Sequence, residues 1–144
     1  TGNISYDPEN HQHMTDMRAA KIAGIVRDIP EQEIQCGEKT GRMVLVGWGS
    51  TFGPINQAVR QAREEGHRVA QIHIRYIVPL PSNLGDLLNG FDRVLVPEMN
   101  NGQLLTLLRS TYAIHAEGLN KVSGKPFKVS EILDAIRTQM GSAS

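Results

Sequence analysis

Residues 43–54 constrain the fold of this chain more than any other stretch. They begin with four apolar residues, Met43 to Val46, and such an uncharged run is typical of a strand buried on both faces of a parallel sheet. A glycine-containing turn follows, and from Pro54 onward the apolar period changes from two residues to about 3.6. The apolar positions of this second segment are Ile55, Ala58, Val59 and Ala62. The stretch therefore predicts a strand, a tight turn and an amphipathic helix.

Three glycines shape the predicted turn. Gly47, Gly49 and Gly53 permit backbone angles and close approaches that other residues resist, and Ser50 or Thr51 is placed to cap the helix. A helix N-terminus with two hydroxyls also favours an anion, so the turn is a candidate anion site. The spacing G-x-G-x-x-x-G departs from the G-x-G-x-x-G fingerprint of dinucleotide-binding turns. A tight turn that lets strand and helix pack closely is the simpler interpretation.

The alternation of strand and helix continues along the chain. Further strands are expected at residues 69–77, 94–96 and 112–116. The helices that follow them are marked by apolar residues at helical spacing. These are Leu84, Leu87, Leu88 and Phe91, then Leu104, Leu107 and Leu108, and finally Ile132, Leu133, Ile136 and Met140. The pattern predicts an α/β open sheet with right-handed crossovers and helices on both faces.

The boundaries of this domain are suggested by the ends of the periodic segments. Residues 1–30 are expected to hold a linker and an N-terminal helix from a preceding domain, with a helix start at Asp7-Pro8-Glu9. Residues 31–140 form the predicted domain, and residues 141–144 are expected to fray. Within the domain, apolar and polar residues alternate over residues 32–36, which predicts a short edge strand.

Charge balance and cysteine content disfavour several classes of function. The 15 Lys and Arg balance 15 Asp and Glu, so electrostatics give no case for a nucleic-acid or membrane-surface partner. No apolar run approaches the ~18 residues of a membrane span, and we expect no signal segment. The single cysteine, Cys36, excludes an internal disulfide framework and is compatible with a cytoplasmic protein.

Motifs for catalysis and metal binding are weak in this chain. The five histidines are His11, His13, His67, His73 and His115. The first two would point apart on a helix and the others fall on separate predicted elements, so a zinc site is not expected. The sequence has neither a P-loop nor a serine-hydrolase elbow. Arg75 lies near the end of the second predicted strand, where it could hold a 2′-phosphate if the glycine turn bound a dinucleotide.

Glu98 is the acid whose position is most informative. It follows a fully apolar strand and Pro97, at the edge where open α/β sheets bind ligands, and it lies close in sequence to Asn100 and Gln103. These three polar residues are candidates for a cluster that binds a small molecule or a neighbouring chain. Alternatively, Glu98 and Asn100 cap the helix that carries Leu104, a role that needs no ligand.

Several motifs occur together in the order seen in one known family. They are Gly2 to His11, Gly47 to Thr51, Pro79 to Pro81, Val96 to Asn100 with Gly102 to Leu104, and Gly124 to Phe127. In these motifs the chain resembles the alpha subunits of 2-oxoacid:ferredoxin oxidoreductases, most closely the 2-oxoglutarate enzyme. The resemblance covers nearly the whole chain, and the motifs together are more specific than any one of them.

The resemblance implies a three-layer fold similar to the C-terminal domain of transketolase. Its mixed five-stranded sheet would be mostly parallel, with one antiparallel edge strand at residues 32–36. Family members oxidatively decarboxylate a 2-oxoacid onto coenzyme A with thiamine diphosphate and iron–sulfur clusters, and they reduce ferredoxin. The resemblance places the thiamine cofactor between other domains and the cluster in a partner subunit. Cys36 alone cannot supply the Cys₄ ligation of a cluster, so no cofactor and no catalytic residue is assigned to this chain.

The expected role is therefore a non-catalytic scaffold within such an alpha subunit. Its expected partners are the upstream domain of the same subunit, the beta subunit and, for the whole enzyme, ferredoxin; a homodimer is compatible with the sequence. If so, an apolar patch should be exposed where a partner domain is missing. The alternative is a small-anion or nucleotide-binding regulatory module at the sheet edge. The candidate residues for ligand or interface are Gly49, Ser50, Thr51, Arg75, Glu98, Asn100 and Gln103.

Overall fold

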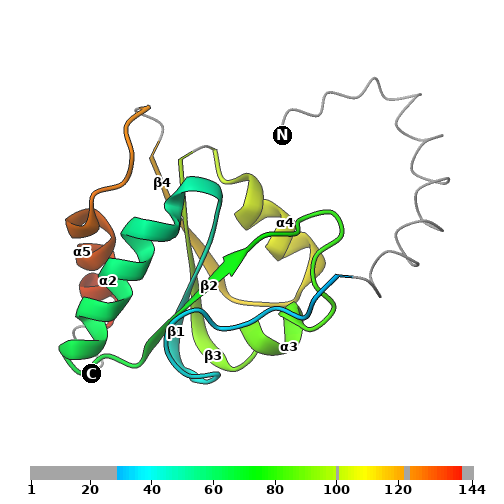
Figure 1. Ribbon diagram of the computed structural model, residues 1–144, viewed down its shortest axis with the longest axis horizontal. Helices are drawn as coiled ribbons and strands as arrows, with labels where there is room; N and C mark the ends of the chain where they lie inside the picture. The colour runs from blue at the N-terminus through cyan, green and yellow to red at the C-terminus, as the bar shows by residue number, and fades with distance from the viewer. Residues whose placement is uncertain (1–28, 100, 122–123, 141–144) are drawn as a thin grey trace, which may run out of the picture.

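The computed structural model describes residues 29–99, 101–121 and 124–140 (Figure 1). The helix predicted before residue 29 and the tail predicted after residue 140 lie outside the described residues. The elements that position the candidate site lie within them, in one alternating series of strands and helices.

Four strands form one parallel sheet in the order β2-β1-β3-β4. Their bounds are Gly41–Trp48 for β1, Val69–Ile74 for β2, Phe91–Glu98 for β3 and Ala116–Asn120 for β4. The predicted central strand is confirmed, because β1 pairs with both β2 and β3. Met43 to Val46 are completely buried, as a strand covered on both faces requires.

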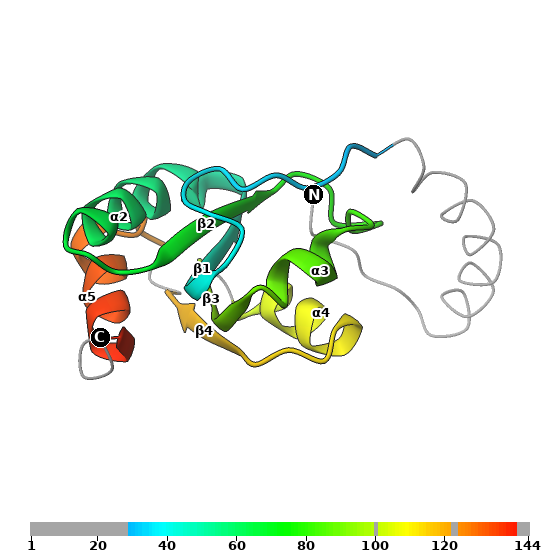
Figure 2. The same cartoon turned by 90° about the horizontal axis from the view of Figure 1, so that it is seen from below.

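Helices cover both faces of this sheet (Figure 2). A 3₁₀ turn, η2 (Gly49–Thr51), leads into α2 (Phe52–Glu64), and α3 (Leu84–Leu88), α4 (Gln103–Thr111) and α5 (Val129–Met140) follow. Apolar residues of α2 and α5 pack on one face with Met43 and Leu45, and those of α3 and α4 pack on the other with Val44 and Val46. The alternation of side chains along β1 thus separates two cores, which confirms the three-layer α/β/α architecture.

The predicted antiparallel edge strand is not formed. Residues 32–36, here called the strap, run along the outer edge of β2 with a single antiparallel bridge between Cys36 and Gln71. The Gln35 amide donates to the Gln71 carbonyl at 2.9 Å, and the Gln71 amide donates to the Cys36 carbonyl at 2.8 Å. Among the described residues the sheet therefore has four strands, all parallel.

At His73, the next outward-facing position of β2, glutamine side chains of the strap make the hydrogen bonds that a strand backbone would make. The His73 amide donates to Gln35 Oε1 at 2.6 Å, and Gln32 Nε2 donates to the His73 carbonyl at 2.9 Å. The backbone of Gln32 is in turn paired with the side chain of Asn83, which accepts at 2.7 Å and donates at 3.0 Å. The backbone groups of β2 at these positions thus have hydrogen-bond partners although no paired strand is formed. Period-two alternation alone therefore could not predict whether residues 32–36 form a strand.

Two other predicted boundaries were wrong. The fourth strand was predicted at residues 112–116, but β4 begins at Ala116. The Tyr112 ring instead packs beside Gly85 of α3, where an added Cβ would lie 2.8 Å from its Cδ1. Arg109 also holds the start of β4, because its guanidinium donates to the Ala116 carbonyl at 3.0 and 2.6 Å. Phe91, predicted to extend a helix, begins β3.

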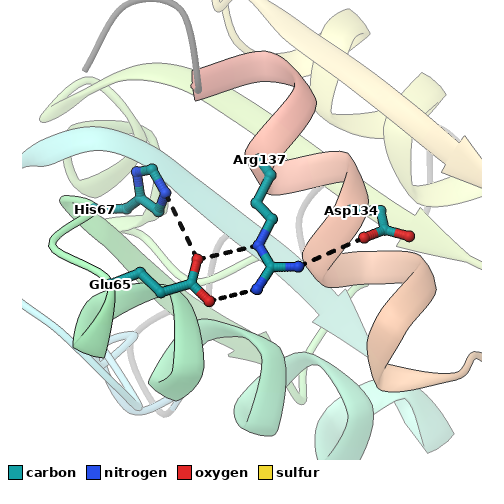
Figure 3. Close-up of polar contacts among 4 residues, drawn as sticks. All are labelled: Glu65, His67, Asp134 and Arg137. Atoms are coloured by element: carbon teal, nitrogen blue, oxygen red, sulfur yellow. Dashed lines mark hydrogen bonds and ion pairs between the residues drawn. The ribbon is translucent and has the colours of Figure 1, made fainter.

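Helices α2 and α5 are joined at their outer surface by an ion-pair cluster (Figure 3). Arg137 on α5 donates two hydrogen bonds to Glu65: its Nε lies 3.0 Å from Oε1, and its Nη2 donates to Oε2. His67 Nε2 lies 3.9 Å from Glu65 Oε1, and Arg137 Nη1 lies 3.7 Å from Asp134. The hydrogen bond from Arg137 holds the pKa of the Glu65 carboxyl below its usual value. This bidentate contact links the C-terminal ends of the two helices.

The lowered pKa of Glu65 predicts an acid-dependent loss of stability. Its contribution is complete above the ordinary glutamate pKa of about 4.3 and is lost as pH falls through the lower folded value, because the protonated carboxyl no longer pairs with Arg137. Free energies of unfolding from urea titrations between pH 7 and pH 2 should fall more steeply for the native chain than for Arg137→Met. Arg68→Met, an exposed arginine outside the cluster, is the control, and equal slopes for Arg137→Met and the native chain would contradict the prediction.

Candidate functional site: the carboxyl edge of the sheet

Three loops meet at the carboxyl edge of the sheet, as parallel strands require. They comprise the 3₁₀ turn η2 (Gly49–Thr51) after β1, residues 75–83 after β2 and the segment that starts at Met99 after β3. The ends of β1 and β2 lie side by side because Trp48 pairs with Ile74. These loops carry the candidate residues named from the sequence.

Two of the three glycines in the turn occupy positions that a larger residue would not fit without a change in the structure. An added Cβ on Gly47 would lie 2.5 Å from Ile55 Cδ1 and 2.7 Å from Thr51 Oγ1, so any side chain at this position would displace Ile55 or Thr51 where α2 packs on β1. Gly49 has a φ of +65°, which L side chains rarely adopt. A Cβ on Gly53 would face open space among the described residues, and its φ is not positive. The prediction of close strand–helix packing is confirmed at Gly47.

The two hydroxyls of the turn do not act as predicted. Thr51 occupies the N-cap position of α2, but its Oγ1 donates to the Trp48 carbonyl at 3.0 Å rather than accepting from the helix. Ser50 Oγ lies 3.9 Å from Met99 Sδ, a weak contact across two loops. The capping role predicted for these residues was therefore wrong, and the Thr51 hydroxyl stabilises the turn itself.

Glu98 is buried and caps the next helix. Its side chain is at the end of β3 with only 1 % of the residue exposed. Oε2 accepts from the Leu104 amide and Oε1 from the Leu105 amide, both at 2.9 Å, and the Trp48 indole nitrogen lies 3.4 Å from Oε2. The carboxylate thus satisfies two first-turn amides of α4 and complements the helix dipole. The structure shows the cap that the sequence allowed for Glu98, whereas Asn100, the other predicted capping residue, lies outside the described residues.

A cavity of about 170 Å³ brings together part of the candidate set. It is lined by Trp48, Gly49, Ser50, Thr51, Glu98 and Met99. Arg75 instead lines a larger groove of about 1150 Å³ between the strap and α3. Gln103 is exposed in the first turn of α4, and Asn100 lies outside the described residues. The structure therefore divides the predicted site between two depressions.

His73 is a polar residue of this region that the sequence did not single out. Its Nδ1 is buried without a hydrogen-bond partner among the described residues, and the Phe52 ring meets its imidazole edge-on at 5.1 Å. Burial lowers the pKa of His73, and the charge of Arg75 lowers this pKa further. The edge-on contact with Phe52 is a packing arrangement. Its sequence signal is the position of His73 between buried residues of β2.

The structure offers no metal centre within the residues that it describes. No group of three or more His, Cys, Asp or Glu side chains is placed to hold an ion in residues 29–99, 101–121 and 124–140. Over the same residues, no helix is long and apolar enough to cross a bilayer.

Comparison with known proteins gives one family and several relatives. The family model described as pyruvate:ferredoxin oxidoreductase core domain II matches residues 41–132. The chain is 41% identical over 140 residues to the 2-oxoglutarate oxidoreductase subunit KorA of Mycobacterium tuberculosis, which covers 97% of this chain and 21% of the relative. It is also similar to the alpha subunit of 2-oxoacid:ferredoxin oxidoreductase 2 of Aeropyrum pernix, with 31% identity over 94% of this chain and 22% of the relative.

A solved structure agrees with these relatives. The 2-oxoglutarate:ferredoxin oxidoreductase of Magnetococcus marinus, determined with 2-oxoglutarate, coenzyme A and succinyl-CoA bound, superposes with a TM-score of 0.79. The identity is 25%, and the match covers 97% of this chain and 25% of that chain. A split-gene transketolase, 14% identical over 77% of this chain and 42% of its own, shares the fold with a TM-score of 0.58. The transketolase-like architecture and the resemblance to alpha subunits are thereby confirmed.

Proposed function

This chain belongs to the pyruvate:ferredoxin oxidoreductase core domain II family, and from that premise we propose that it is a scaffold domain without catalytic groups. The parent would be the alpha subunit of a 2-oxoacid:ferredoxin oxidoreductase. The chain spans about a fifth of the length of the first four curated relatives that it matches. A domain of this size within such a subunit leaves ample chain for the chemistry to lie elsewhere.

The observation that carries this proposal is the internal use of polar groups at the carboxyl edge. The Glu98 carboxylate is occupied by two amides of α4, and the Thr51 hydroxyl is occupied by the Trp48 carbonyl. A group already bound inside the fold has to break those contacts before it can act on a substrate. The edge that holds ligands in many open α/β sheets is here used to connect β1, β3 and α4.

For the parent enzyme we propose oxidative decarboxylation of 2-oxoglutarate to an acyl-CoA with reduction of ferredoxin, in the cytoplasm. The relative named 2-oxoglutarate oxidoreductase and the structure with 2-oxoglutarate and coenzyme A bound support this substrate pair. Thiamine diphosphate and an iron–sulfur cluster would be bound by other parts of the complex, which includes a beta subunit. Within the subunit, residues 1–30 would connect an upstream domain to the domain of residues 31–140.

The competing proposal is a regulatory module that binds a small anion or nucleotide at the glycine turn. The 170 Å³ cavity beside Gly49, Ser50 and Thr51 favours it, since the cavity lies at the start of η2 and α2. However, the Glu98 carboxylate lines the same cavity and would repel an anion placed there. The scaffold is therefore the function that the geometry supports better.

The test is an assay of the complete enzyme with changes at this cavity. We expect Ser50→Ala in the purified complex to leave kcat and KM for 2-oxoglutarate-dependent, CoA-dependent ferredoxin reduction within about twofold of the native values. A tenfold loss of kcat/KM with an unchanged melting temperature would contradict the scaffold role. Pyruvate serves as the comparison substrate, and a complex that oxidises pyruvate in preference to 2-oxoglutarate would contradict the substrate assignment.

A further inference from the structure

Exposed large apolar side chains gather at one end of the molecule. Among the described residues they are Phe52, Tyr76 and Val78, which are 40%, 44% and 68% exposed. We call these three residues the docking surface. Phe52 begins α2, directly after the turn that follows β1, and Tyr76 and Val78 lie in the loop after β2, so the apolar exposure is concentrated at the carboxyl edge rather than scattered.

The sheet brings the two loops together. Trp48 at the end of β1 pairs with Ile74 at the end of β2, so Phe52 and Tyr76 follow neighbouring strand ends. The Phe52 ring also lies edge-on at 5.1 Å from His73, which places it over the end of β2. Fixed strand ends therefore hold the docking surface, although its residues come from separate parts of the chain.

A groove begins at the edge of the docking surface. It has a volume of about 1150 Å³ and lies between the strap and α3, with Tyr76 and Arg75 among its lining residues. Ile34 of the strap and Leu87 of α3 supply apolar walls. Val78 lies two residues after Tyr76 and is mostly exposed, and the size of the groove admits several side chains of a partner.

We propose that another domain of the same alpha subunit packs on the docking surface and into this groove. This proposal rests on the proposed function and adds to it the place of contact. The argument for the occupant is chain length: the relatives that match over 94–97% of this chain are about five times as long, so most of such a subunit lies outside the described domain. Domains of one chain commonly share an interface of about 600–1,500 Å², and an exposed apolar surface is where such an interface is expected.

The chemistry of the docking surface specifies what the partner domain presents. Val78 and Phe52 require apolar side chains, because more than a third of each is exposed here. Arg75 stands next to Tyr76 at the rim of the groove and is suited to a carboxylate or a backbone carbonyl at the edge of the contact. The contact therefore combines the exposed apolar side chains of the docking surface with the polar side chains that line much of the groove.

Hydrogen exchange on the full-length alpha subunit, alone and with its beta subunit, tests this proposal. We expect the amides of residues 76–78 to exchange at least about tenfold more slowly in the isolated subunit than an exposed loop does, since the partner domain covers them. Val78→Glu should remove that protection because it places a charge in an apolar contact. Thr138→Glu, which adds the same charge at an exposed position of α5, is the matched control and should change nothing.

A second pair of variants separates contact from misfolding. Tyr76→Phe keeps the apolar ring and should keep the protection, whereas Tyr76→Ser should lose it while the amides of β1 stay protected. Free exchange of residues 76–78 in the isolated native subunit would overturn the proposal, as would protection that arises only with the beta subunit or only in an alpha dimer. None of these readouts depends on which 2-oxoacid is oxidised, so they fail separately from the proposed function.

Discussion

Glu98→Ala should destabilise the domain by about 2–4 kcal/mol. The substitution removes the acceptor of the Leu104 and Leu105 amides, and it leaves these two donors of α4 in a buried place. It also removes a negative charge from the positive end of the helix dipole. Urea unfolding at pH 7, followed by circular dichroism, measures the change as a lower midpoint with an unchanged slope.

Two further variants make this prediction specific. Glu98→Gln keeps one acceptor oxygen and should cost about half as much, because the helix amides lose the charge and one partner but not both partners. Glu117→Ala removes a carboxylate from an exposed position of β4 and should stay within about 0.5 kcal/mol of the native chain. Equal effects of Glu98→Ala and Glu117→Ala would show that the Glu98 cap contributes nothing to stability.

Gly47→Ala should cost about 1–3 kcal/mol, whereas Gly53→Ala should cost nothing. The new methyl group at residue 47 would lie 2.5 Å from Ile55 Cδ1, and relieving that contact moves α2 away from β1 or forces Ile55 off its rotamer. At residue 53 the methyl group faces open space inside a helix, where alanine is better than glycine by up to ~1 kcal/mol.

Gly47→Ala and Gly53→Ala together distinguish a steric contact with Ile55 from a general need for glycine in the turn. Thermal unfolding of both variants should move the midpoints in opposite directions, down for Gly47→Ala and level or up for Gly53→Ala. If both variants lose stability equally, backbone freedom throughout the turn matters more than the close approach of Ile55. Such a result would contradict the packing explanation given for Gly47.

The central strand–turn–helix unit could be predicted because its signals are local. Each signal spans only a few residues: four uncharged apolar residues, a glycine turn and apolar residues at helical spacing. In the structure these segments form β1, η2 and α2. The two roles of Glu98 could not be separated in this way. Whether a carboxylate reaches amides six and seven residues ahead depends on the path of the loop between them, and only the structure shows that path.

The other differences arise from contacts that join distant segments. The strap does not form the predicted strand because Gln32 and Gln35 bind the backbone of His73 through their side chains. The alternation of apolar and polar residues does not indicate such side-chain hydrogen bonds. The fourth strand was misplaced because Tyr112 packs on α3 and Arg109 fixes Ala116, and both contacts depend on tertiary structure. The three exposed large apolar residues, Phe52, Tyr76 and Val78, follow β1 and β2, and the sequence pattern does not distinguish them from buried apolar residues.

The strap has a consequence for how this domain behaves at high concentration. A parallel sheet has two outer edges, and an open edge invites strands from other molecules to add by backbone pairing. At the β2 edge, the strap already occupies the outward-facing groups of Gln71 and His73. Intermolecular sheet growth and aggregation are therefore expected to begin at β4, the other outer strand of the described sheet. Solubility under concentration or partial heating should respond to charge on β4 and not to charge on the strap.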